Sequence, residues 1–146
     1  MRKIFHIIAV TLPLATASAA PAAPAAITIS DAWMRALPAS LPSGGYFTLH
    51  NNGSKPVTLT GAQSPACGMV MLHKSENQGG MSSMMDMAQV MIPAGSTVSF
   101  APGGYHLMCM SPAASIKPGT QVPVTLLFAD GAKVTAPFAV RNAAGK

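Results

Sequence analysis

Two histidines and two methionines have a spacing that suits a metal site: His73, Met84, His106 and Met108, in the pattern His-x10-Met-x21-His-x-Met. His106 and Met108 are two residues apart in an expected strand, so their side chains point to the same face. If His73 and Met84 approach that face, two imidazole nitrogens and two thioether sulfurs meet. Thioether sulfur favours Cu(I), whereas zinc prefers thiolate, imidazole and carboxylate, and calcium and magnesium need oxygen. The spacing therefore predicts a Cu(I) site.

More methionines lie in the segment Ser75–Met87, which is polar, contains two adjacent glycines and is predicted to be a flexible crossing or a hairpin. The candidates there for a secondary soft-metal surface are Met81, Met85 and Met87. Methionine on a strand is more often a core residue that fills gaps. We expect this packing role for Met69, Met71 and Met91.

Cys67 and Cys109 are the only cysteines of the chain. In an exported protein an even pair of cysteines usually forms a disulfide, which is the role we expect here. Ligation of a metal by the two thiolates is the alternative, because both residues lie close in sequence to the candidate ligands. The pair is not a Cys-x-x-Cys redox motif.

The elements that must position these residues are predicted to be strands. Apolar runs are short, alternating or rich in β-branched residues, and Gly, Pro, Asn or Asp bounds them. The expected strands are Ile27–Arg35, Gly45–His50, Val57–Ala62, Gly68–His73, Met84–Ile92, Thr97–Phe100, Tyr105–Met110, Val122–Phe128 and Lys133–Val140. Asp130-Gly131 gives the clearest hairpin signal. The pattern predicts an all-β domain, either a two-sheet antiparallel sandwich or a barrel.

Composition is that of one globular domain. The chain has 146 residues, of which 49% are hydrophobic and 9% are charged, which argues against disorder. Its formal charge is +5, but apart from Arg2 and Lys3 near the start the lysines and arginines are scattered singly, so nucleic acid is not an expected partner. The four acidic residues show no catalytic arrangement, and there is no nucleophile elbow or phosphate loop. We therefore expect a protein that is not an enzyme.

The first 20 residues are predicted to be an export signal. Arg2 and Lys3 precede an apolar stretch, and Ala17-Ser18-Ala19 has the small-residue pattern of a cleavage site. The stretch is shorter than the about 20 apolar residues of a membrane span, and Pro13 interrupts it. No cysteine near the cleavage site offers a point for lipid attachment. We expect a soluble periplasmic protein with an Ala/Pro leader at 21–26, a domain at 27–140 and a tail at 141–146.

The metal motif resembles that of the PCu(A)C family of periplasmic copper chaperones, also written PCuAC. The residues His73, Met84, His106 and Met108 match the family's motif position for position. Neighbouring residues agree too: Met71-Leu72-His73, Ile92-Pro93-Ala94-Gly95 and Pro102-Gly103-Gly104-Tyr105-His106-Leu107-Met108. The similarity covers roughly residues 27–140.

This resemblance implies a cupredoxin-like Greek-key β-sandwich that binds one Cu(I) per chain. We expect the chain to be a monomer. The resemblance also implies delivery of the copper to the binuclear copper site of cytochrome c oxidase, either directly or through a Sco-type thioredoxin-like protein. Cys67 and Cys109 are outside the family's metal motif. Some members bind Cu(II) through a His- and Met-rich C-terminal tail, but residues 141–146 contain neither residue type, so the sequence does not support a Cu(II) site.

Two other functions would use similar residues. A periplasmic copper-scavenging or resistance protein has the same site and differs only in lacking a recipient. A cupredoxin electron carrier needs a cysteine thiolate, two histidines and an axial methionine. In the usual cupredoxin order a histidine follows the cysteine by a few residues, and none follows Cys109 in this way.

Overall fold

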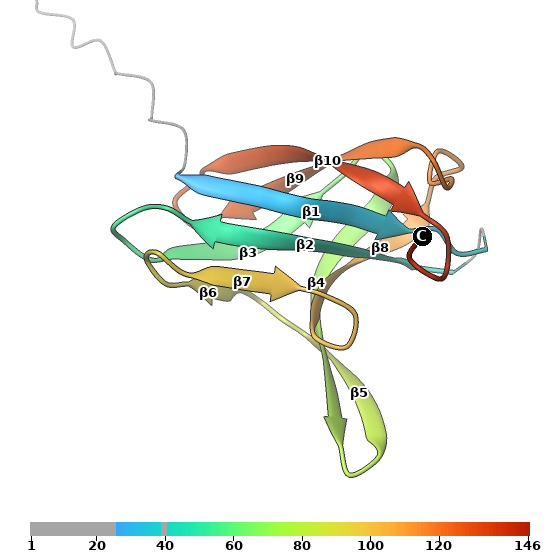
Figure 1. The fold of residues 1–146 in the computed structure, drawn as a ribbon, viewed down its shortest axis with the longest axis horizontal. Coiled ribbons are helices and arrows are strands. Elements are labelled where there is room, and N and C mark those ends of the chain that lie inside the picture. Colours follow the sequence, from blue (N-terminus) through green and yellow to red (C-terminus); the bar gives the residue numbers. More distant parts are fainter. Residues whose placement is uncertain (1–25, 39–40) are drawn as a thin grey trace, which may run out of the picture.

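The computed structural model describes residues 26–38 and 41–146, and in these ranges the chain forms ten β-strands and no helix (Figure 1). The predicted signal peptide, and its leader up to residue 25, lie outside the described residues. No described segment is a helix of the length and apolarity that crossing a membrane requires. The all-β prediction is confirmed.

The strands largely follow the predicted order. Their bounds are β1 (Ile27–Arg35), β2 (Ser43–Asn51), β3 (Val57–Gln63), β4 (Cys67–Gln78), β5 (Met81–Asp86), β6 (Val90–Ile92), β7 (Thr97–Phe100), β8 (Tyr105–Pro112), β9 (Gln121–Phe128) and β10 (Lys133–Arg141). Hydrogen bonds join them in the order β5-β4-β8-β7-β2-β1-β10-β9-β3-β6, and β8 also pairs with β2.

The sheet bends back on itself around one core. β3, near one end of the strand order, also lies close to β4, near the other end. The pairings are antiparallel except for β1 with β10 and the short contact of β7 with β8, which are parallel. Phe47 stacks on Phe100 with ring centroids 4.3 Å apart, and Phe138 lies beside Phe47. These buried rings fill the space between the two layers of strands.

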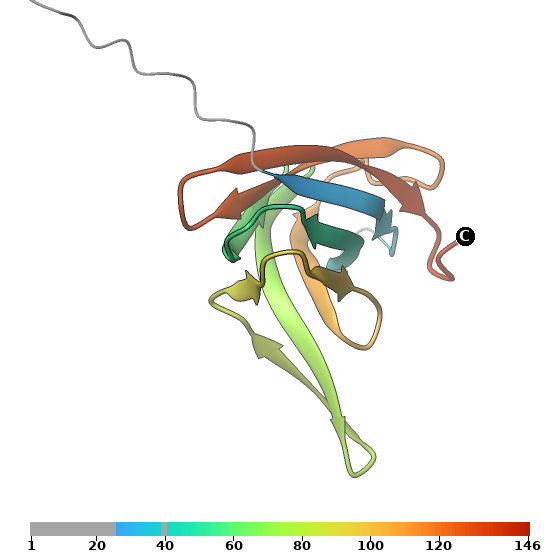
Figure 2. The same cartoon turned by 60° about the vertical axis from the view of Figure 1, so that its left-hand side comes forward.

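The predicted strand Met84–Ile92 is wrong, because the structure divides this segment into β5 and β6. β5 pairs only with β4, whereas β6 pairs with β3 at the opposite end of the strand order. β4 runs on to Gln78, and a turn at Gly79 and Gly80, both with positive φ, returns the chain as β5. The resulting β4–β5 hairpin extends well beyond the other strands (Figures 1 and 2).

Two methionines expected in the core are exposed. Met69 is 59% exposed and Met91 is 63% exposed, whereas Met71 is half-buried. Alternation along β4 explains the outcome for Met69, because Val70 and Leu72 point to the core while Met69 and Met71 alternate with them and point outward. Methionine is apolar enough to suggest a core position, but its place in the strand period decides which face it occupies.

Candidate metal centre

The two candidate histidines lie directly opposite each other on neighbouring strands. His73 of β4 pairs with His106 of β8, and Leu72 pairs with Leu107 one position away. Both leucines are buried in the core. Because neighbouring residues of a strand point to opposite faces, the leucines fix the register that brings both imidazoles to the outer face of the sheet. The imidazole ring centroids are 5.6 Å apart, with one ring edge-on to the other.

His106 is held in the orientation that a metal ligand needs. Its side chain is 4% exposed, and its Nδ1 lies 3.0 Å from the carbonyl oxygen of Gly104. A carbonyl oxygen only accepts hydrogen bonds, so Nδ1 carries the proton and Nε2 keeps a free lone pair. Nε2 is buried and has no hydrogen-bond partner. A backbone carbonyl that fixes the tautomer of a histidine is the usual outer-shell arrangement at metal sites.

His73 also keeps its ring nitrogens free of hydrogen bonds. Nε2 lies 2.8 Å from Oδ1 of Asp86, its cross-strand partner on β5, but the contact lacks hydrogen-bond alignment. Asp86 is largely exposed, with 76% of its side-chain surface accessible. The carboxylate can therefore swing into solvent and leave Nε2 to another partner. Nδ1 of His73 and Nε2 of His106 are buried and have no partner at all, which is costly to a fold unless these nitrogens have another role.

Both candidate methionines lie on the same face as the histidines. Met108 follows His106 by two residues, and Met84 of β5 pairs with Ser75, which follows His73 by two residues. A pocket of about 400 Å³ opens here, and Met84, His106 and Met108 line it together with Tyr46 and Arg35, among others. Met84 is 61% exposed. The structure thus brings all four predicted residues to one outer face, with one thioether in solvent on the hairpin.

Met81, Met85 and Met87 occupy the other face of the hairpin. They alternate with Met84 and Asp86 along the chain, and Met85 pairs with Lys74 rather than with a histidine neighbour. Met87 packs partly against the core. These three methionines therefore do not line the pocket that Met84 lines, and a secondary soft-metal surface formed by them stays a prediction.

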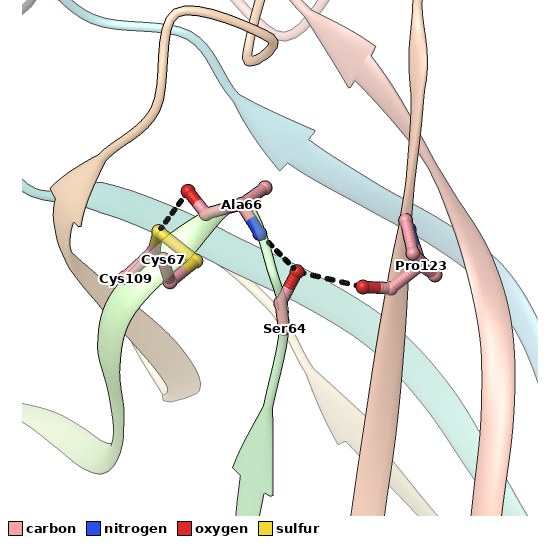
Figure 3. The surroundings of a disulfide bond; sticks show 5 residues. All are labelled: Ser64, Ala66, Cys67, Cys109 and Pro123. Carbon is pink, nitrogen blue, oxygen red and sulfur yellow. Dashed lines mark hydrogen bonds between the residues drawn. A yellow bond between two sulfur atoms is a disulfide. The ribbon is translucent and has the colours of Figure 1, made fainter.

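Cys67 and Cys109 form a disulfide, with Cα atoms 5.4 Å apart (Figure 3). Cys109 is fully buried on the core face, opposite to the neighbouring Met108. Beside the bond, the amide of Ala66 donates to Ser64 Oγ, which donates to the carbonyl oxygen of Pro123 at 2.6 Å. In this form neither sulfur is a thiolate, so the alternative of cysteine metal ligands does not describe this structure.

Nitrogen and oxygen ligands alone do not build a site here. Within residues 26–38 and 41–146, no three His, Cys, Asp or Glu side chains gather closely enough to hold a metal ion. The candidate site on the outer face of β4 and β8 would add the thioether sulfurs of Met84 and Met108 to the two imidazoles. Such a donor set favours a soft ion such as Cu(I).

Sequence reasoning missed three contributors to this region. The carbonyl of Gly104 and the ring of Tyr46, whose centroid is 6.3 Å from that of His106, support the buried imidazole. Asp86 reaches His73 only because β5 pairs with β4 in one particular register. Spacing along the chain carries no signal for such cross-strand partners. Only a prediction of the hairpin register would have found Asp86.

The fold and the site define a class: an all-β, cupredoxin-like domain with an imidazole and thioether cluster on one outer face. The chain matches the family described as "Putative lipoprotein LpqE-like" over residues 27–140 and belongs to that family. A relative, "Putative lipoprotein Lxx21020" of Leifsonia xyli subsp. xyli, is 35% identical over 115 residues, which are 78% of this chain and 68% of the relative.

Solved structures of PCuAC domains are similar to this chain. The copper-bound PCuAC domain from PmoF2 aligns with a TM-score of 0.68 and 26% identity, over 82% of this chain and 96% of that domain. The solution structure of Cu(I)-DR1885 from Deinococcus radiodurans aligns with a TM-score of 0.62 and 32% identity, over 75% of this chain and 74% of that one. These similarities confirm the PCuAC-type resemblance and the cupredoxin-like fold.

Proposed function

We propose that this chain is a Cu(I) metallochaperone that holds one copper ion between His73, Met84, His106 and Met108. The observation that carries the proposal is the buried His106 imidazole, whose Nδ1 is fixed by Gly104 and whose Nε2 is free. Copper-bound structures of similar PCuAC domains support the choice of metal.

The donor set suits a carrier of Cu(I). A thioether, unlike a thiol, carries no proton that it must lose before it binds the ion. Thioethers also do not form disulfides in an oxidising compartment, so two imidazoles and two thioethers can hold Cu(I) there. Three donors come from the paired strands β4 and β8, and the fourth, Met84, comes from the exposed hairpin. Exchange of Met84 for a ligand of an acceptor protein is then the simplest first step of release.

We propose the periplasm as the compartment and the binuclear copper site of cytochrome c oxidase as the destination, reached directly or through a Sco-type protein. The disulfide agrees with an oxidising compartment. A scavenging protein would have the same site without an acceptor. Copper content of the oxidase in a strain that lacks this protein separates the two roles, because only loss of a chaperone lowers it.

The disulfide argues against an electron carrier. A blue-copper site requires a cysteine thiolate on the metal, and both cysteines of the chain are bonded to each other. A Cu(II)–thiolate bond absorbs strongly in the visible range, whereas Cu(I) is colourless in any site. We therefore expect the copper-loaded protein to show no intense visible band even after the copper is oxidised to Cu(II), because the disulfide leaves no thiolate to bind it. An intense blue colour would contradict this part of the proposal.

An anaerobic titration with Cu(I) against a chromophoric Cu(I) chelator tests the site. We expect the wild-type domain to retain one tightly bound equivalent and the His73→Ala/Met84→Ala variant to lose it. The matched control is Met85→Ala, which removes a neighbouring exposed methionine from the other face of the same hairpin. The control should keep the tight equivalent.

Circular dichroism and urea unfolding show whether each variant is folded. Met84 is exposed and His73 lies outside the core, so both substitutions should leave the fold intact. Equal affinity of the wild type and the folded double variant would refute the assigned ligands. Failure of the wild type to compete with the chelator would refute the chaperone proposal itself.

A further inference from the structure

The outer face of β4 and β8 carries more thioethers than the proposed site uses. Next to the pair His73 and His106 along the two strands, the following pairs on this face are Met71 with Met108, and Met69 with Met110. We call these four methionines the methionine ladder. Met108 belongs to the proposed site, so the ladder continues directly from it and leaves three thioethers without an assigned role.

Core packing does not explain these three residues. The core face of the same strands is occupied by Leu72, Leu107 and Cys109, all of them buried. Met69 is 59% exposed, and Met71 and Met110 are half-buried on the opposite face. A methionine that faces solvent contributes little to stability through burial. Their shared property is a row of sulfur atoms that leads to the proposed copper site.

The spacing of the ladder suits one soft ion. Side chains of directly paired residues have Cβ atoms about 4.5–5.5 Å apart, and diagonal neighbours are about 7–8 Å apart. Met69 and Met110 are a direct pair, and Met71 is the diagonal neighbour of Met110 and lies two residues from Met69. Each sulfur lies two bonds beyond Cβ on a flexible side chain, so the three thioethers can converge on a single ion.

We propose that Met69, Met71 and Met110 form a second, weaker site that takes Cu(I). Three neutral thioethers without imidazole bind a soft monovalent ion and discriminate against zinc, calcium and magnesium. The site is weaker than the first because it lacks nitrogen donors and is more exposed. The inference rests on the proposed function, since a second thioether site serves a protein that already carries Cu(I).

Counting bound copper with matched variants tests the ladder. The probe is Cu(I) under anaerobic conditions, followed by chelator competition and by native mass spectrometry. The ladder variant is Met69→Leu/Met110→Leu, which preserves volume and removes two sulfurs. The control is Met91→Leu, which alters an equally exposed methionine of β6, paired with Thr58 and remote in the strand order. Urea unfolding verifies that each variant folds.

We expect two equivalents on the wild type and on the control, with the second bound at least tenfold more weakly. The ladder variant should bind one equivalent with the tight affinity unchanged, and His73→Ala/Met84→Ala should keep only the weak one. Two equivalents on the ladder variant would overturn the inference, as would a single wild-type equivalent that disappears with His73 and Met84. A single equivalent that disappears only in the ladder variant would overturn the proposed function and leave the ladder standing.

Discussion

Replacing both Cys67 and Cys109 with alanine should destabilise the domain by about 4 kcal/mol at 25 °C. The disulfide joins residues separated by 42 positions. In the chain-entropy account of cross-links, opening a loop of this length increases the entropy of the unfolded chain by an amount worth about 4 kcal/mol. For a domain of this size, such a loss lowers the melting temperature by roughly 15 °C.

Urea unfolding of the wild type, the double alanine variant and the wild type in reductant measures this effect. Both cysteine-free and reduced forms should shift to lower urea concentration, and the variant should lose slightly more because Cys109 is fully buried and alanine leaves a small void. A loss below about 1 kcal/mol in the variant would refute the reasoning, since the cross-link would then not restrict the unfolded chain as its loop length requires.

Copper binding gives the complementary readout. Cys109 points to the core, away from the face of Met108, so the folded alanine variant should bind Cu(I) as tightly as the wild type. Tighter binding by the reduced wild type than by the alanine variant would show that free thiols can ligate the metal. That result would contradict a purely structural role for the cysteines.

Two further substitutions probe the fold. Leu107→Ala should lower the free energy of unfolding, measured in urea, by about 2–5 kcal/mol, because removal of the fully buried side chain leaves a cavity. The Cu(I) affinity of the folded fraction should stay unchanged, because Leu107 faces away from His106 and Met108. Asn51→Ala should cost about 2–4 kcal/mol in the same assay. The buried amide of Asn51 donates to the carbonyl oxygens of Lys55 and Ile92 and accepts from Gly53, so its removal leaves several backbone groups unpaired; a loss under 1 kcal/mol would contradict this.

The sequence predicts those features of the site that depend on local alternation. The shared face of His106 and Met108 follows from their i, i+2 spacing in a strand, and the structure agrees. The strand from Tyr105 onward was predictable because buried leucine and cysteine alternate with the site residues. Local periodicity is sufficient wherever one face of a strand is buried.

Features that depend on pairing between strands could not be predicted in this way. The two adjacent glycines of the segment Ser75–Met87 made a hairpin one of two possibilities, but the methionines before Val90 show no clear alternation of polar and apolar residues. The sequence therefore did not indicate where β5 ends or that β6 joins β3. The contact of Asp86 with His73 depends on the register of the β4–β5 pairing. Methionine is both apolar and a metal ligand, so composition alone does not distinguish a core position from an outward one.

Because Met84 lies on the β4–β5 hairpin, the proposed site combines a part that opens easily with a part that does not. All six residues of β5 are exposed, and β5 is bonded to β4 alone at the edge of the sheet, whereas β8 lies between partners and borders the core. Segments with few buried contacts open at a lower free energy than the global unfolding free energy. Amide protons of β5 should therefore exchange faster than those of β8, and Met84 can leave a bound ion through local opening of the arm alone. The off-rate of the ion would then be set by the opening of this hairpin, while His106 keeps its place in the rigid part of the fold.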